Sequence, residues 1–91
     1  MPYIAGKSVE QLKFITDQID AMGAVTPGEI NYLITQLLIK QANMHGVNYT
    51  NLNMLVGAVE SAKTEFQRRV VAPYEDQKAY DNGDVYASLM P

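Results

Sequence analysis

The side chains that could perform chemistry in this sequence are few, and they form no catalytic constellation. The chain has no cysteine and a single histidine, His45, which excludes a thiol nucleophile and a Cys/His zinc site. His45 has no nucleophile beside it at a motif spacing, so it fits a cation at a helix C-terminus better than a general base. The sequence therefore predicts a protein that is not an enzyme, with no catalytic residue, no metal ion and no cofactor.

Three motif fragments have simpler explanations. Residues 6–8 (Gly-Lys-Ser) match the end of a phosphate-binding loop, but the earlier glycine and strand are missing. Residues 81–84 (Asp-Asn-Gly-Asp) resemble part of a calcium loop without its closing glutamate. Residues 48–50 (Asn-Tyr-Thr) form a glycosylation sequon in a chain with no secretory signal. We interpret them as the cap of the first helix, a tight turn and the start of the third helix.

The residues best suited to hold a ligand are cationic and lie along the last long helix. Lys63 falls within the apolar stripe of that helix. An ammonium group there must extend to solvent, pair with a carboxylate such as Glu60, or bind an anion.

Arg68 and Arg69 follow one turn later, just before Pro73 and Tyr74. Either arginine can pair with Glu65 at a spacing of three or four residues. Alternatively, two guanidinium groups beside an aromatic ring can hold phosphate and a stacked base. The predicted ligand-binding set is Lys63, Arg68, Arg69, Tyr74 and Tyr49.

Composition limits the partners of the chain. Its 91 residues, 47% hydrophobic and 19% charged, are typical of one globular domain. A net charge of -3 argues against binding to a DNA or RNA polymer. There is no bilayer-spanning apolar run and no signal peptide at the N-terminus. We therefore expect a cytoplasmic protein without membrane contact.

Apolar residues recur every three or four positions in three segments, which predicts an all-α domain. The first helix covers about 9–22 and follows a capping-box pattern at residues 8–11. The second covers about 27–44, with Thr26 as N-cap, Pro27 at the first helical position and Gly46 as the stop. The third covers about 50–72, begins after Asn48 or Thr50, and is expected to end or kink at Pro73.

A short helical turn follows Pro73, and residues 81–91 read as a turn and a polar tail. We expect residues 1–91 to form a single domain with flexible ends at 1–7 and 81–91.

Several apolar and small residues lie outside one buried face. Tyr32 and Ile39 are seven residues apart on the side of the second helix opposite its main stripe. Gly57 interrupts the third helix at a cost of about 1 kcal/mol, which suggests close approach of another helix. These three residues are the predicted interface of a homo-oligomer.

Residues 28–35, 48–49, 59–76 and 82–86 together resemble a family of short phage and prokaryotic proteins whose function is unassigned. The resemblance covers about two-thirds of the chain and implies a phage setting, in which the host cytoplasm is the site of action. It implies no activity.

Residues 63–75 are also similar to the last helix of the phage anti-CBASS sponges, above all at residues 66–73 with their Arg-x-Val-Ala-Pro ending. That family consists of small all-helical homo-oligomers, which sequester cyclic oligonucleotide immune signals without cleaving them. The resemblance implies that Arg69 takes the place of the family's helix-terminal arginine. The N-terminal parts do not match.

These observations lead to two alternative functions. The first is a phage-type, non-enzymatic binding protein that sequesters a nucleotide-derived immune signal, such as a cyclic nucleotide or an ADP-ribose-type ligand. The second is a structural or protein-interaction module, for instance a phage accessory protein that docks on a host protein. In the second case, Arg68 and Arg69 would only make ion pairs.

Overall fold

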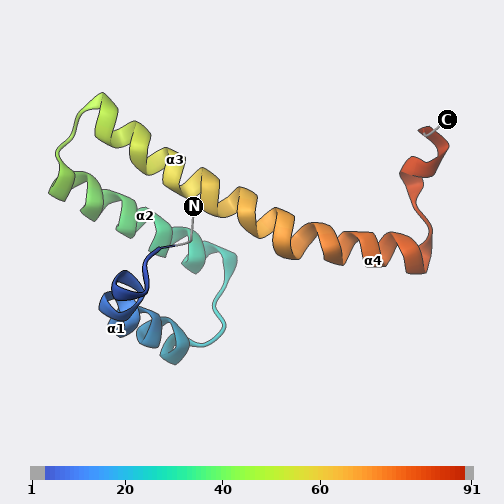
Figure 1. Cartoon of the computed structure of the whole chain (residues 1–91), viewed down its shortest axis with the longest axis horizontal. Coiled ribbons are helices and arrows are strands. Elements are labelled where there is room, and N and C mark those ends of the chain that lie inside the picture. Colours follow the sequence, from blue (N-terminus) through green and yellow to red (C-terminus); the bar gives the residue numbers. More distant parts are fainter. Residues whose placement is uncertain (1–3, 90–91) are drawn as a thin grey trace.

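The computed structural model describes residues 4–89, and this part of the chain is helical without a strand. The all-α prediction is confirmed. Figure 1 shows a helical hairpin, a first helix that lies beside it, and a long arm that projects from it. The elements are α1 (Gly6–Met22), α2 (Pro27–His45), α3 (Tyr49–Phe66), the π-helical turn η1 (Gln67–Val71), α4 (Ala72–Asn82) and the 3₁₀ turn η2 (Val85–Leu89).

The hairpin of α2 and α3 begins and turns at the residues that the sequence indicated. The Thr26 hydroxyl accepts the amide N–H of Glu29, and the Glu29 carboxylate accepts the amide N–H of Thr26, which completes a capping box. The Asn48 side chain caps α3 by accepting the amide N–H of Asn51 at 2.9 Å. The Asn51 side chain in turn donates to the carbonyl oxygens of His45 and Gly46, which fixes the connection.

The start of α1 differs from the prediction. The helix begins at Gly6 with Ala5 as its N-cap, and no side chain caps it. Ser8 lies within the first turn, where its amide N–H already donates to the carbonyl oxygen of Ala5. The predicted capping box at residues 8–11 is therefore wrong, because the helix starts before the serine hydroxyl could satisfy a first-turn amide.

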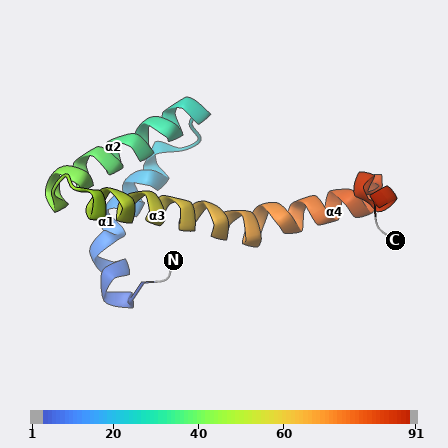
Figure 2. The same ribbon diagram turned by 90° about the horizontal axis from the view of Figure 1, so that it is seen from above.

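The helix does not end at Pro73, which was one of the two outcomes expected there. It passes through η1, where the Ala72 amide N–H donates to the carbonyl oxygen of Gln67, and continues as α4 to Asn82. Proline lacks an amide donor, and its ring would clash with the carbonyl group four residues earlier in a regular α-helix. The wider π turn just before Pro73 accommodates the ring, so α3 and α4 form one rod (Figure 2).

The ends of the chain are more helical than predicted where the structure describes them. Residues 81 and 82 belong to α4, and Gly83 ends that helix with φ 92°. Residues 85–89 form η2 rather than an irregular tail. Residues 1–3, 90 and 91 of the predicted ends lie outside the described residues.

The chain has no buried core among its described residues. Leu38, Leu55 and Val59 are half-buried in the hairpin, whereas the apolar stripe of α1 is exposed. The radius of gyration is 17.7 Å, compared with about 12 Å for a compact domain of this length. The accessible surface is 8047 Å², roughly 2,700 Å² more than the ~5,300 Å² that a folded monomer of this mass exposes. A lone chain therefore leaves a large apolar surface in water.

Candidate functional site

The arginine pair lies in the π turn that Pro73 imposes on the long rod. The Nε atom of Arg68 donates to the Glu65 carboxylate at 3.1 Å, and a terminal nitrogen of the guanidinium group pairs with the same oxygen. No carboxylate of the described residues lies within ion-pair distance of Arg69. The two arginines therefore differ, because Arg68 is held by its own helix and the Arg69 guanidinium is available to another anion.

Lys63 takes the position that its place in the apolar stripe predicted. Its stem lines a groove between α2 and α3, while its ammonium group reaches Glu60 at 3.5 Å. Both side chains are more than half exposed, so the pair contributes little to stability. The ammonium group remains accessible to a stronger anionic partner.

The two tyrosines of the predicted set are not close together in one chain. Tyr74 lies one turn after the arginines, and the ammonium group of Lys78 sits 5.6 Å from its ring centroid. Tyr49 is the first residue of α3 and is 84% exposed. It lies about 37 Å from Tyr74 along the rod, at about 1.5 Å per residue. Within one chain, Tyr49 cannot complete a site with Tyr74.

The predicted interface residues are accessible. Tyr32 and Ile39 are 61% and 49% exposed on α2. A Cβ atom built on Gly57 would meet nothing within 4 Å, so no helix of the same chain approaches there. Gly57 instead lines a shallow hollow of about 430 Å³ with Glu60, Ser61, Thr64 and Glu65.

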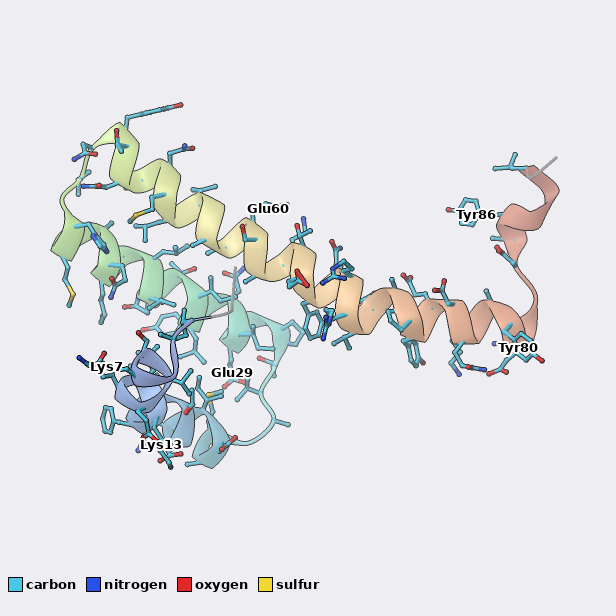
Figure 3. All side chains as sticks on the ribbon, in the orientation of Figure 1. Lys7, Lys13, Glu29, Glu60, Tyr80 and Tyr86 are labelled. Carbon is cyan, nitrogen blue, oxygen red and sulfur yellow. The ribbon has the colours of Figure 1, made fainter. Side chains whose placement is uncertain are left out.

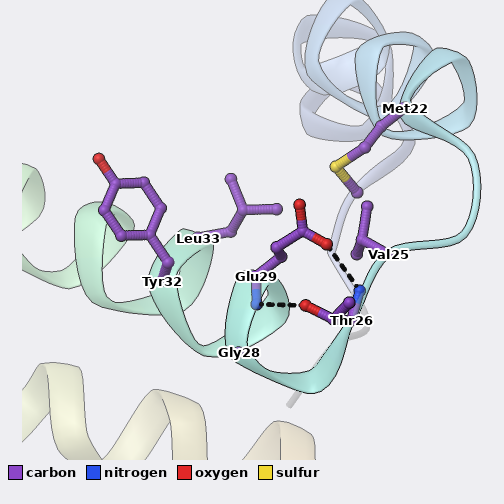
Figure 4. A pocket seen from close by; sticks show the side chains of 7 residues that line it. All are labelled: Met22, Val25, Thr26, Gly28, Glu29, Tyr32 and Leu33. Atoms are coloured by element: carbon purple, nitrogen blue, oxygen red, sulfur yellow. Dashed lines mark hydrogen bonds between the residues drawn. The ribbon is translucent and has the colours of Figure 1, made fainter.

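A second hollow lies where α1 meets α2, and Figure 4 shows its lining. Met22, Val25 and Leu33 form its apolar part, and Thr26 and Glu29 its polar part. The Glu29 carboxylate is already bonded to the amide N–H of Thr26 at 2.9 Å. This hydrogen bond, with help from the Thr26 hydroxyl, lowers the pKa of Glu29. The polar groups here serve the helix cap.

One large apolar surface was not predicted from the sequence. A groove of about 720 Å³ runs between α2 and α3, where the sequence pattern suggested a buried stripe. The signal was present in the sequence, because the stripe of α2 and the stripe of α3 both face the groove. Its lining residues are Ile30, Ile34, Leu37, Leu38, Gln41, Leu55, Ala58, Val59, Ala62, Lys63 and Phe66.

Within the part of the chain that the structure describes, the remaining acidic and histidine side chains do not gather into a metal centre. No group of three or more His, Asp or Glu side chains in residues 4–89 is placed to hold a metal ion. No helix in this range is long and apolar enough to cross a bilayer. Tyr80 and Tyr86 lie at the far end of the arm, away from the hairpin (Figure 3).

The fold and these surfaces define a small all-α protein built from an open helical hairpin and a projecting arm. The model of a domain of unknown function (DUF6899) matches residues 1–85, and the chain belongs to that family. No curated protein and no solved structure matches the chain. The expected membership in a family of unassigned function is confirmed, and the phage setting and the likeness to anti-CBASS sponges stay predictions.

Proposed function

We propose that this chain is a non-enzymatic binding protein that works as a homo-oligomer and sequesters a small, nucleotide-derived anion. The observation that carries the proposal is the surface of roughly 2,700 Å² beyond that of a folded monomer. Obligate homo-oligomers bury accessible surface of this order at their interfaces. A further copy of the same chain presents apolar faces of matching chemistry, so self-association removes them from water.

The ligand is assigned from the cationic residues of the rod. Arg69 has no carboxylate partner among the described residues, and Lys63 is held only by an exposed ion pair. A guanidinium group and an ammonium group together suit phosphate oxygens. With a net charge of -3, the protein would repel a nucleic-acid polymer and admit a small anion at this local patch. The similarity of residues 63–75 to the anti-CBASS sponges supports a cyclic nucleotide or an ADP-ribose-type signal.

A structural or protein-interaction module is the second candidate, for instance a phage accessory protein that docks on a host protein. The observation that favours it is the pairing of Arg68 with Glu65 and of Lys63 with Glu60. In this case, the cations serve the helix, and the exposed Tyr32 and Ile39 contact a partner protein.

The sponge hypothesis is tested by thermal shift against cyclic dinucleotides, cyclic trinucleotides and ADP-ribose derivatives. A ligand present at about a hundred times its dissociation constant stabilises the folded state by about 2.7 kcal/mol. We expect one compound class to raise the melting temperature. Flat responses from a well-folded sample would refute the sponge and favour the interaction module.

The site is tested by charge reversal of Arg69. Arg69→Glu is expected to abolish the stabilisation by the active compound and to leave the helical content unchanged, because Arg69 makes no ion pair with any residue between 4 and 89. Lys40→Glu is the matched control, since it makes the same charge change on α2, where Lys40 bonds to Gln36. Undiminished binding by the Arg69 variant would show that the site lies elsewhere.

A further inference from the structure

We propose that the apolar groove between α2 and α3 is the seam of a homodimer, in which two hairpins close into a four-helix bundle with each α2 lying over the α3 of its partner. This inference rests on the proposed self-association and specifies its geometry. It makes no use of the ligand, so the two proposals can fail separately.

The walls of the groove are already in place in a single chain, before any partner binds. Leu38 on the α2 wall and Leu55 and Val59 on the α3 wall are half-buried members of its lining. The hydrogen bonds of Asn51 to the connection after α2 fix one end. Pre-ordered walls reduce the entropy that association must overcome.

The two walls differ in size in a way that makes the groove complementary to itself. The α2 wall carries a ridge of large side chains, Ile30, Ile34 and Leu37, at spacings of four and three residues. The α3 wall has small side chains, Ala58 and Ala62, in its middle. Large residues pack best against small ones on the facing element.

A two-fold axis that runs along the helices places the ridge of each copy over the small residues of the other. All neighbouring helices in that bundle are antiparallel, as in common four-helix bundles. In the other face-to-face arrangement, the two-fold axis runs across the helices, so that α2 faces α2 and α3 faces α3. The two ridges then meet each other, and the small residues also face each other. Because an isologous interface repeats every contact twice, size matching decides between them.

The exposed surface of the chain as a whole is of the size that a stable dimer covers. A stable interface covers about 800 Å² per partner, and obligate homodimers cover more. The chain exposes roughly 2,700 Å² more than a folded monomer, counted over α1, the hairpin and the arm together, and the groove contributes part of it. Three side chains of the groove are close to half exposed or more and would be buried in the dimer: Ile30, Leu37 and Phe66.

This arrangement has a consequence for the arms. Both copies of α3 run in the same direction, so both arms leave the bundle at the same end. The four guanidinium groups of the Arg68 and Arg69 pairs are thereby gathered at one end of the dimer, next to Lys63. Only some of this charge is balanced by Glu65 and Glu60.

The first experiment measures mass by light scattering. The wild type is expected at twice the 10.1 kDa of the chain, or at a multiple of that dimer. Ile34→Glu puts a charge in the groove and is expected to give monomers, whereas Ile39→Glu, at the interface predicted from the sequence but outside the groove, is expected to leave the dimer intact. A monomeric wild type, or dissociation by Ile39→Glu and not by the groove variant, would overturn the proposal.

The second experiment does not require a variant to dissociate. The natural chain has no cysteine, so single cysteines can be placed at will. A mixture of Leu37→Cys chains with Ala58→Cys chains is expected to form a disulfide-linked heterodimer, and a mixture of Ile39→Cys with Ala58→Cys is not. Absence of the Leu37–Ala58 cross-link in a folded dimer would exclude this seam. If Ile15→Glu on α1 then dissociates the dimer, α1 of the second copy is the occupant of the groove.

Discussion

At the scale of single residues, most polar contacts join side chains that are close in sequence. Lys13 pairs with Asp17, Lys63 with Glu60, and Arg68 with Glu65. Such pairs follow from the helical period and were predictable for Lys63 and the arginines. Sequence alone left open which arginine would pair with Glu65, and in the structure that carboxylate accepts from Arg68.

The first prediction concerns the pH dependence of the α2 start. The pKa of Glu29 is lowered in the folded chain by its hydrogen bonds with Thr26. A carboxyl group with a lowered pKa stabilises the fold above its unfolded pKa, and this contribution is lost as the pH falls through the folded value. We expect the amide signals of the first α2 turn in NMR spectra to shift in acid. Glu29→Gln should remove that titration, and its persistence would show that another group causes the shift.

The second prediction concerns the cap of α3. Asn48→Ala removes the side-chain acceptor of the Asn51 amide and is expected to destabilise the fold by about 1 kcal/mol. The measurement is the urea midpoint at a fixed protein concentration. Thr16→Ala is the control, because Thr16 bonds only within α1 and makes no cap. An equal effect of both variants would rule out capping as the reason.

At the scale of elements, the hairpin was predictable and the arm was not. The pattern of Thr26, Pro27 and Glu29 at the start of α2 is local, and the structure has the complete capping box. Pro73 gives a strong local signal to stop, yet a π turn absorbs it and the helix runs on to Asn82. A proline in a helical pattern predicts a break or a kink, whereas this backbone forms a π turn and continues as a helix.

The third prediction tests the cause of that π turn. Pro73→Ala restores an amide donor and removes the ring clash, so η1 should convert to regular α-helix. Helical content should rise or stay constant, and the stability should not fall, since Ala is the better helix former. Carbonyl and amide chemical shifts of residues 67–72 report the change. If the π pattern persists in the variant, Pro73 is not its cause.

At the scale of the whole molecule, the decisive feature is the missing core. None of the described residues is buried, and the chain extends over 51 × 34 × 29 Å. The apolar content of 47% is nevertheless ordinary for a globular domain. The chain has the usual share of apolar side chains but does not bury them itself. Self-association would bury them against another copy.

The fourth prediction is a melting temperature that depends on concentration. Because association stabilises the folded chain by mass action, the melting temperature followed by circular dichroism should rise over about a hundredfold increase in protein concentration. The Ile34→Glu groove variant should lose this dependence. A wild-type melting temperature that is constant over the whole range would mean that the chain is stable alone.

The order of the amino acids was enough to specify the helices, their caps at Thr26 and Asn48, and the cations that could meet an anion, because these depend on neighbours within a few residues. It could not specify that α1 would stay off the α2–α3 groove, that Tyr49 and Tyr74 would lie at different places on one rod, or that Gly57 would face open space. Those facts depend on how segments far apart in the chain are placed in space. An apolar stripe has the same pattern whether its own chain covers it or another copy does, and it took the three-dimensional arrangement to show that this chain leaves its stripe open.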